Sequence, residues 1–125
     1  MEYLEELPQD CPLNQADDKQ IDVAYRVVSS INPTIDDFRS NAALNKVKPP
    51  TVDSCQWASC SLFTSKDKVL NIAGKLPKTR IANPHISMCT IKSGVGKSYI
   101  KGKHVDFWPF SHFDPAAVVV KTEKV

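Results

Sequence analysis

Apolar and polar side chains alternate from Ile21 to Val28, and this period limits the fold more than any other feature of the sequence. The side expected to face the core carries Ile21, Val23, Tyr25 and Val27, which is the spacing of a half-buried strand. Four further segments read as strands, residues 55–63, 81–92, 98–107 and 116–122. Proline and glycine pairs separate them, so we predict a protein built around a β-sheet.

Two stretches between these segments have helical spacing instead. Thr34 and Asp37 form a typical N-terminal cap, which predicts a short helix over residues 35–44. Ser65 and Pro77 bound a second helix in the same way. The predicted fold class is therefore α+β: a single domain with a mostly antiparallel sheet of about five strands and two short helices on one face.

The length of 125 residues, with 42% hydrophobic and 24% charged positions, fits one globular domain. No apolar run approaches the ~18 residues that span a bilayer, and acidic residues stand where a secretory signal would carry lysines. We expect an acidic N-terminal arm at residues 1–20, a single α+β domain at residues 21–125, a cytoplasmic location and no membrane contact.

Charge is distributed unevenly along the chain, although the net charge is only +2. Residues 1–18 hold six acids and no base, whereas residues 65–104 hold nine bases against Asp67 alone. A basic stretch of this density attracts phosphate groups, and it is also typical of solvated helix faces and edge strands. The acidic arm could lie against it.

The four cysteines, Cys11, Cys55, Cys60 and Cys89, are expected to be reduced and buried. A chain that packs its own core does not need a disulfide framework, and we expect no export signal. Their spacing also lacks the second close pair that a zinc knuckle requires, so we expect no structural zinc.

Two motifs invite a chemical interpretation. The segment from Gly94 to Ser98 ends like a phosphate-binding loop, but the residues after it favour a strand rather than a helix, so we interpret it as a glycine turn. The pairs His104/Asp106 and His112/Asp114 could each present an imidazole beside a carboxylate to a metal or a reacting group. We expect a structural role for them and predict no metal and no cofactor.

Two short patches resemble known enzyme families. His85-Ile86-Ser87 resembles one half of the paired signature of two-histidine phosphoesterases, whose second half is absent. Tyr25-Arg26-Val27-Val28 and Ser59-Cys60-Ser61 resemble the opening of ADP-ribosyltransferases, in which an arginine on the first strand and a serine-rich second strand hold the nicotinamide cofactor. That family completes its site with a late glutamate, and here the resemblance implies Asp106 or Glu123 instead.

The function expected from these features is that of a small binding or accessory module, not an enzyme, because no acid, base and nucleophile meet at defensible spacing. By analogy with small bacterial proteins that work beside another gene product, we expect a protein partner, and a homodimer is a further alternative. The expected binding surface is the segment 92–113, with the residues Lys92, Lys97, Lys101, Lys103, His104, Trp108 and Phe110.

Two alternatives stay open. An ADP-ribosyltransferase-like or other nucleotide-handling enzyme, or its inactive relative, would bring the candidate catalytic residues together in one pocket. Those candidates are Arg26, Ser61, His85, His104 and Asp106, with Ser59 beside them. A nucleic-acid-binding domain would use the basic region 65–104 and lose affinity steeply with salt.

Overall fold

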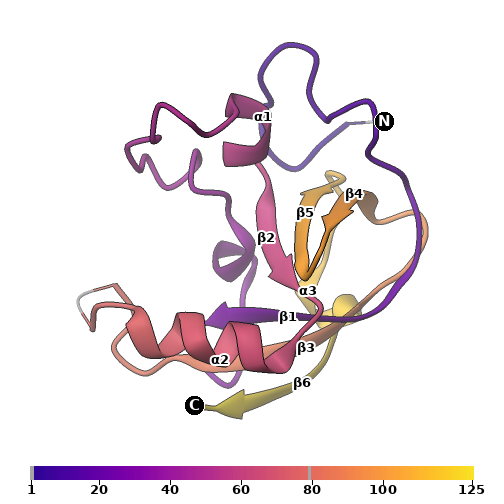
Figure 1. Ribbon diagram of the computed structural model, residues 1–125. Helices are drawn as coiled ribbons and strands as arrows, with labels where there is room; N and C mark the ends of the chain where they lie inside the picture. The colour runs from indigo at the N-terminus through magenta and orange to yellow at the C-terminus, as the bar shows by residue number, and fades with distance from the viewer. Residues whose placement is uncertain (1, 79) are drawn as a thin grey trace.

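The computed structural model describes residues 2–78 and 80–125 of the chain. Its elements are, in chain order, β1 (Ile21–Val28), a 3-10 helix η1 (Ile35–Phe38), α1 (Ser54–Trp57), β2 (Cys60–Phe63), α2 (Lys66–Lys75), β3 (His85–Ile91), β4 (Gly96–Lys101), β5 (His104–Pro109), α3 (Pro115–Val118) and β6 (Val119–Lys124). The six strands form one antiparallel sheet in the order β4-β5-β2-β1-β3-β6 (Figure 1). The α+β prediction is confirmed, with one more strand than expected. No described helix is long and apolar enough to cross a membrane.

The sheet is divided between β1 and β2. These strands share a single pair of opposed residues, Tyr25 and Phe63, whereas β1 opposes β3 at six positions. In Figure 1, β1, β3 and β6 run across the picture while β2, β4 and β5 stand nearly upright, so the two halves cross steeply. One core cluster joins the halves and includes Ala24, Val28, Leu62, Cys89, Ile91, Val105 and Phe107.

The buried side of β1 is not the side that the alternation predicts. Ala24 and Val28 are fully buried, whereas Val23 is 41% exposed. The register of β1 against β3 shifts between Ile21 and Ala24, and such a bulge moves the following residues to the opposite face. Because side chains two residues apart in a strand lie on the same face of the sheet, the Arg26 side chain leaves β1 on the same face as those of Ala24 and Val28.

The second predicted helix is confirmed as α2. The Ser65 hydroxyl accepts a hydrogen bond from the Lys68 amide at the N-terminus, and the helix buries Val69 and Ala73. It packs against β1, β2 and β3 (Figure 1). The helix ends before Pro77, as expected from the missing amide of proline.

The first predicted helix is shorter than the expected residues 35–44, because only η1 forms. The Thr34 amide donates to the Asp37 carboxylate at 2.9 Å, so the predicted cap is present. The carbonyls of Asp37 and Arg39 accept hydrogen bonds from the Arg26 side chain instead of from later amides. The backbone at Arg39 is extended, with ψ 147°, and the Ser40 amide donates to the Glu5 carboxylate, so the helical hydrogen bonds end after η1.

All four further predicted strands have different boundaries. β3 is shorter than residues 81–92, and the segment 116–122 begins as helix α3 before it continues as β6. The segment 55–63 begins as helix α1, because the Asp53 carboxylate caps it by accepting from the Cys55 and Gln56 amides. The segment 98–107 belongs to two strands, β4 and β5, joined by a turn with Gly102 at φ +61°. A left-handed turn of this kind favours glycine, and it adds the sixth strand.

The acidic arm is docked along one end of the sheet. The Leu4 amide donates to the Pro109 carbonyl at 2.9 Å, and Asp17 forms a two-way backbone bridge with Ser98 of the edge strand β4. In the same arm, the Glu5 carboxylate accepts hydrogen bonds from the backbone amide and the hydroxyl of Ser40. The arm therefore ties β4 and β5 to the loop that follows η1.

The expectation of four reduced thiols is wrong for Cys11 and Cys55, which form a disulfide across 44 residues of sequence. The docked arm brings Cys11 to α1 in a small apolar cluster with Trp108, a proximity that sequence spacing could not reveal. Cys60 and Cys89 are free and buried as predicted. Burial raises the pKa of the Cys60 thiol and raises the pKa of Cys89 to about 12, so both stay protonated.

We predict that alkylation without reductant labels no cysteine of the native protein, two cysteines in denaturant, and all four after reduction in denaturant. Mass spectrometry gives these counts. The double variant Cys11→Ser/Cys55→Ser should lower the free energy of unfolding by about 2–4 kcal/mol, because the open chain gains entropy when unfolded. An unfolding midpoint that does not change on reduction would contradict the prediction.

Candidate binding cleft

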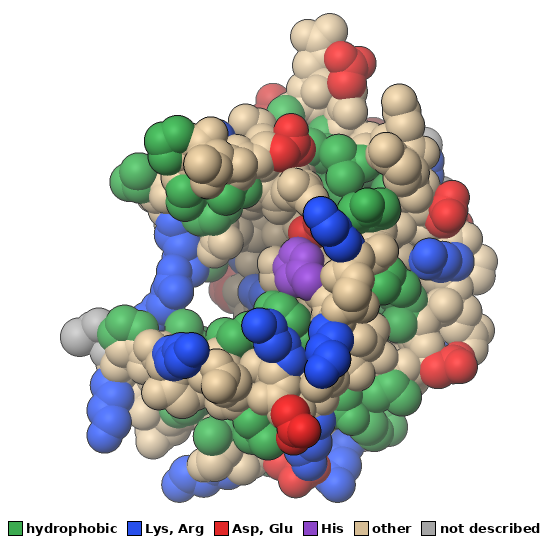
Figure 2. Space-filling model, in the orientation of Figure 1, with side chains coloured by type: hydrophobic (Ala, Val, Ile, Leu, Met, Phe, Trp, Pro, Cys, Tyr) green, Lys and Arg blue, Asp and Glu red, His purple; other side chains and the backbone are tan. Residues whose placement is uncertain are grey.

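A cleft of about 610 Å³ opens where the two halves of the sheet separate. It is lined by β1, η1, residues 39–46, β2, the C-terminal half of α2 and residues 80–81. Figure 2 shows it as the hollow between the lobe that carries α1 and the lobe that carries α2. The split sheet makes the cleft possible, because a continuous ladder between β1 and β2 would close it.

Arg26 forms part of the cleft lining and links three backbone segments. Its Nη1 donates to the Ser61 carbonyl of β2 at 2.8 Å, its Nε to the Asp37 carbonyl at 2.8 Å, and its Nη2 to the Arg39 carbonyl at 3.1 Å. All three partners are neutral, and no ion pair joins Arg26 to an acid within the described part of the chain. The guanidinium therefore brings an uncompensated positive charge to the cleft.

Three other cations line the cleft, Arg39, Lys46 and Arg80, against the acids Asp36 and Asp37. Asp36 pairs with Arg39 at 3.5 Å, and the Asp37 carboxylate accepts from two backbone amides. Burial, together with the charges of Arg80 and Arg26, lowers the pKa of Lys46. The cleft therefore has a net positive lining and favours an anionic ligand.

Apolar side chains also line the cleft. They are Ile72 of α2, Leu76 directly after that helix, Leu44 and Ile81. A ligand that combines a flat apolar ring with a phosphate group would contact both kinds of lining.

Asp106 of β5 is the centre of a buried hydrogen-bond network beside the cleft. It is 3% exposed and opposes Ser61 of β2 in the sheet. Its Oδ1 accepts from the Ser59 hydroxyl at 2.8 Å, and its Oδ2 accepts from Gln56 Nε2 of α1 at 3.1 Å. Because Ser59 also lines the cleft, the network supports the cleft wall from behind.

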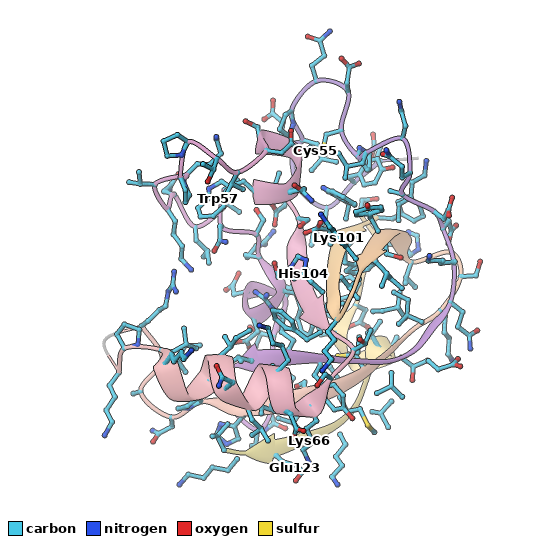
Figure 3. The ribbon with its side chains drawn as sticks, in the orientation of Figure 1. Cys55, Trp57, Lys66, Lys101, His104 and Glu123 are labelled. Atoms are coloured by element: carbon cyan, nitrogen blue, oxygen red, sulfur yellow. A yellow bond between two sulfur atoms is a disulfide. The ribbon has the colours of Figure 1, made fainter. Side chains whose placement is uncertain are left out.

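His104 lies on β5 two residues before Asp106, at the mouth of the cleft (Figures 2 and 3). Its Nδ1 is 3.7 Å from Asp106 Oδ1, and its ring centroid is 5.3 Å from that of Phe63, which lines the cleft. Its side chain is 39% exposed. The imidazole therefore connects the buried acid with the outer surface.

The structure brings together four of the five candidate catalytic residues. Arg26 and Ser61 line the cleft, and Asp106 and His104 lie on the neighbouring strand β5. His85 begins β3, and its Nδ1 lies 2.9 Å from the Asn83 carbonyl. Polar groups from both neighbours of β2 thus lie close to this strand, whereas His85 lies apart from them.

The remaining candidates from the segment 92–113 lie in different settings. Trp108 and Phe110 are buried, with Trp108 Nε1 donating to the Cys55 carbonyl, so neither ring is displayed for a partner. Lys101 and Lys103 are exposed on the β4–β5 hairpin, Lys92 is exposed after β3, and Lys97 is half-buried. The expected partner surface thus keeps its lysines and loses its aromatic anchors.

The second His/Asp pair has structural contacts. A ring nitrogen of His112 lies 2.9 Å from the Gly94 carbonyl, and the Asp114 carboxylate caps α3 at the Ala116 amide. Within the described residues, no three His, Cys, Asp or Glu side chains are grouped to hold a metal ion.

Sequence reasoning missed Gln56, Lys46 and Arg80. Gln56 was placed in a strand that is a helix, and Lys46 and Arg80 lie in irregular segments without a periodic pattern. Arg80 belongs to a long basic stretch of the sequence that does not distinguish it from its neighbours. Folding alone brings Lys46 and Arg80 to the cleft, and Gln56 to Asp106 beside it.

Comparisons with protein-family models, curated proteins and solved structures find no match to this chain. The function is therefore argued from the cleft itself.

We predict that Asp106→Asn lowers the free energy of unfolding by about 1–3 kcal/mol. The asparagine side chain has one oxygen instead of two, so it can accept the hydrogen bond from only one of the two donors, Ser59 and Gln56. The exposed Asp36→Asn is the matched control, with an expected change within about 0.5 kcal/mol. Equal losses in the two variants, measured by urea unfolding, would contradict a supporting role for Asp106.

Proposed function

We propose that this protein is a binding module for a nucleotide, held in the cleft between the two halves of the sheet. The observation that carries this proposal is that the same cleft is lined both by the cations Arg26, Lys46 and Arg80 and by apolar side chains. Phosphate groups fit the cations, and a planar base or nicotinamide ring fits Leu44, Ile72 and Leu76. The volume of about 610 Å³ is within the usual range for small-molecule sites.

The resemblance to ADP-ribosyltransferases narrows the ligand to a nicotinamide dinucleotide. In that family the first-strand arginine and the serine-rich second strand hold the cofactor, and here Arg26, Ser59 and Ser61 line the cleft. Arg26 and Ser61 lie on the adjacent strands β1 and β2, and Ser59 directly precedes β2. The two patches that resemble the family in sequence are therefore also neighbours in space, which supports the proposal.

Binding without transfer is the activity we propose. The acid that would stand in for the late glutamate, Asp106, is 3% exposed, and Ser59 and Gln56 already donate to its two oxygens. A carboxylate in that state is poorly placed to stabilise charge on a bound ribose. The other acid suggested by the sequence, Glu123, lies on β6 and pairs with Lys66 and Lys121. A protein partner for the segment 92–113 stays a prediction.

Isothermal titration with NAD⁺ tests the proposal. Lys46→Ala and Arg80→Ala should each weaken binding about tenfold, which is about 1.4 kcal/mol, since each removes a phosphate contact. The control is Lys19→Ala/Lys92→Ala, which removes two exposed charges outside the cleft and should leave the affinity unchanged. Absence of binding by the wild type rejects the dinucleotide, and steady consumption of NAD⁺ would show transfer or hydrolysis instead of binding.

The affinity should also depend on pH through Lys46. Its lowered pKa means that the ammonium loses its proton at a lower pH than an ordinary lysine, so binding of an anion should weaken earlier as pH rises. Lys46→Arg keeps the charge at every accessible pH and should flatten this decline. Titrations of both proteins across the alkaline range would make the comparison, and parallel pH profiles would contradict the role of Lys46.

A further inference from the structure

A second basic surface lies outside the cleft, around its mouth. It consists of Lys101 and Lys103 on the β4–β5 hairpin and of His104, and we name these three residues the basic rim. Figure 2 shows the imidazole between Lys and Arg side chains at the edge of the hollow, and Figure 3 labels Lys101 and His104. None of the three lines the cleft.

The backbone holds the basic rim together. Lys101 and His104 oppose each other across the β4–β5 ladder, which places their side chains on one face of the sheet. The Lys103 carbonyl accepts from the Thr64 amide at 2.9 Å, which fixes the hairpin beside the start of α2. The position of Lys101 therefore follows from strand pairing, and that of Lys103 from the turn that closes the hairpin.

Little negative charge compensates the basic rim. Among the described residues, neither Lys101 nor Lys103 forms an ion pair, although both are exposed. The nearest acid to His104, Asp106, is buried and hydrogen-bonded to Ser59 and Gln56.

His104 adds an aromatic surface among these charges. Its ring packs against Phe63 with a centroid distance of 5.3 Å and a tilt of 59°, which supports the imidazole from one side. With 39% of the side chain exposed, the imidazole also presents surface to solvent. A supported ring flanked by lysines is the combination that binds an unpaired base and the phosphates on either side of it.

We propose that the basic rim binds single-stranded nucleic acid, with one base stacked on His104 and the backbone phosphates on Lys101 and Lys103. A duplex keeps its bases stacked inside and cannot offer one to His104 without opening. This inference goes beyond the proposed function, because it concerns the outside of the cleft and a polymer instead of a small ligand.

Fluorescence anisotropy with labelled DNA and RNA strands of about 12 nucleotides tests the proposal. Lys101→Ala/Lys103→Ala should weaken binding about tenfold near 0.1 M salt and reduce the slope of log K against log salt by about 1.4, as expected for two lost phosphate contacts. The matched control is Lys121→Ala/Lys124→Ala, which removes two lysines from β6 at the other edge of the sheet and should bind like the wild type. DNA and RNA are expected to bind alike, because no contact to the 2′-hydroxyl is invoked.

The stacking contact has its own variants. His104→Ala should weaken binding at least fivefold, and His104→Phe should restore most of the loss because it returns a stacking ring. The proposal is overturned if no strand binds, if the β6 control loses as much affinity as the hairpin variant, if a duplex of the same length binds as tightly, or if His104→Phe behaves like His104→Ala. NAD⁺ titration of Lys101→Ala/Lys103→Ala separates the two proposals, because this variant keeps the lining of the cleft intact.

Discussion

The Arg26 guanidinium joins the two halves of the sheet where strand pairing between them is almost absent. β1 and β2 oppose each other at one residue pair only, and Arg26 donates across the gap to the Ser61 carbonyl. The same group binds two carbonyls after β1, at Asp37 and Arg39. The sheet can stay open, with a cleft in the opening, because a side chain and not a ladder satisfies these carbonyls. The charge of Arg26 is unneutralised there, so the interaction that holds the cleft also contributes to its positive lining.

Asp106 has the complementary role on the far side of β2. Burying a carboxylate is unfavourable unless its oxygens have partners, and here a hydroxyl from Ser59 and an amide from Gln56 supply them. These contacts fasten α1 to β5 and hold Ser59 at the cleft wall. A polar pair that resembles a reactive centre in sequence, His104 with Asp106, is therefore divided by burial: the acid supports the fold, and the imidazole faces outward. This division is the reason for which we propose binding and not group transfer.

The sequence predicts the fold class and α2, because these depend on period and capping within about ten residues. It fails on the buried face of β1, since a bulge between Ile21 and Ala24 reverses the alternation. It also fails on the helix over residues 35–44, since the contacts at its end come from Glu5 and Arg26 in other segments. In the candidate site, too, local patterns could be predicted and contacts between distant segments could not. Arg26 and Ser61 could be named from local motifs, whereas Lys46, Arg80 and Gln56 join them only through folding. The disulfide could not be found either, because 44 residues separate its cysteines.

The acidic arm supplies none of the cleft lining, yet it restrains the part of the cleft that has least regular structure. Between η1 and α1 the backbone forms turns and irregular segments, and this stretch carries Arg39 and Lys46. The Glu5 carboxylate holds the start of the stretch at Ser40, and the Cys11–Cys55 disulfide holds its end at α1. Two tethers from one arm thus fix both ends of a segment that lacks a ladder of its own. Such a segment would otherwise sample many conformations, and ordering it on ligand binding would reduce affinity. For the binding that we propose, the contribution of the arm is therefore preorganisation, although the arm contributes no residue to the cleft lining.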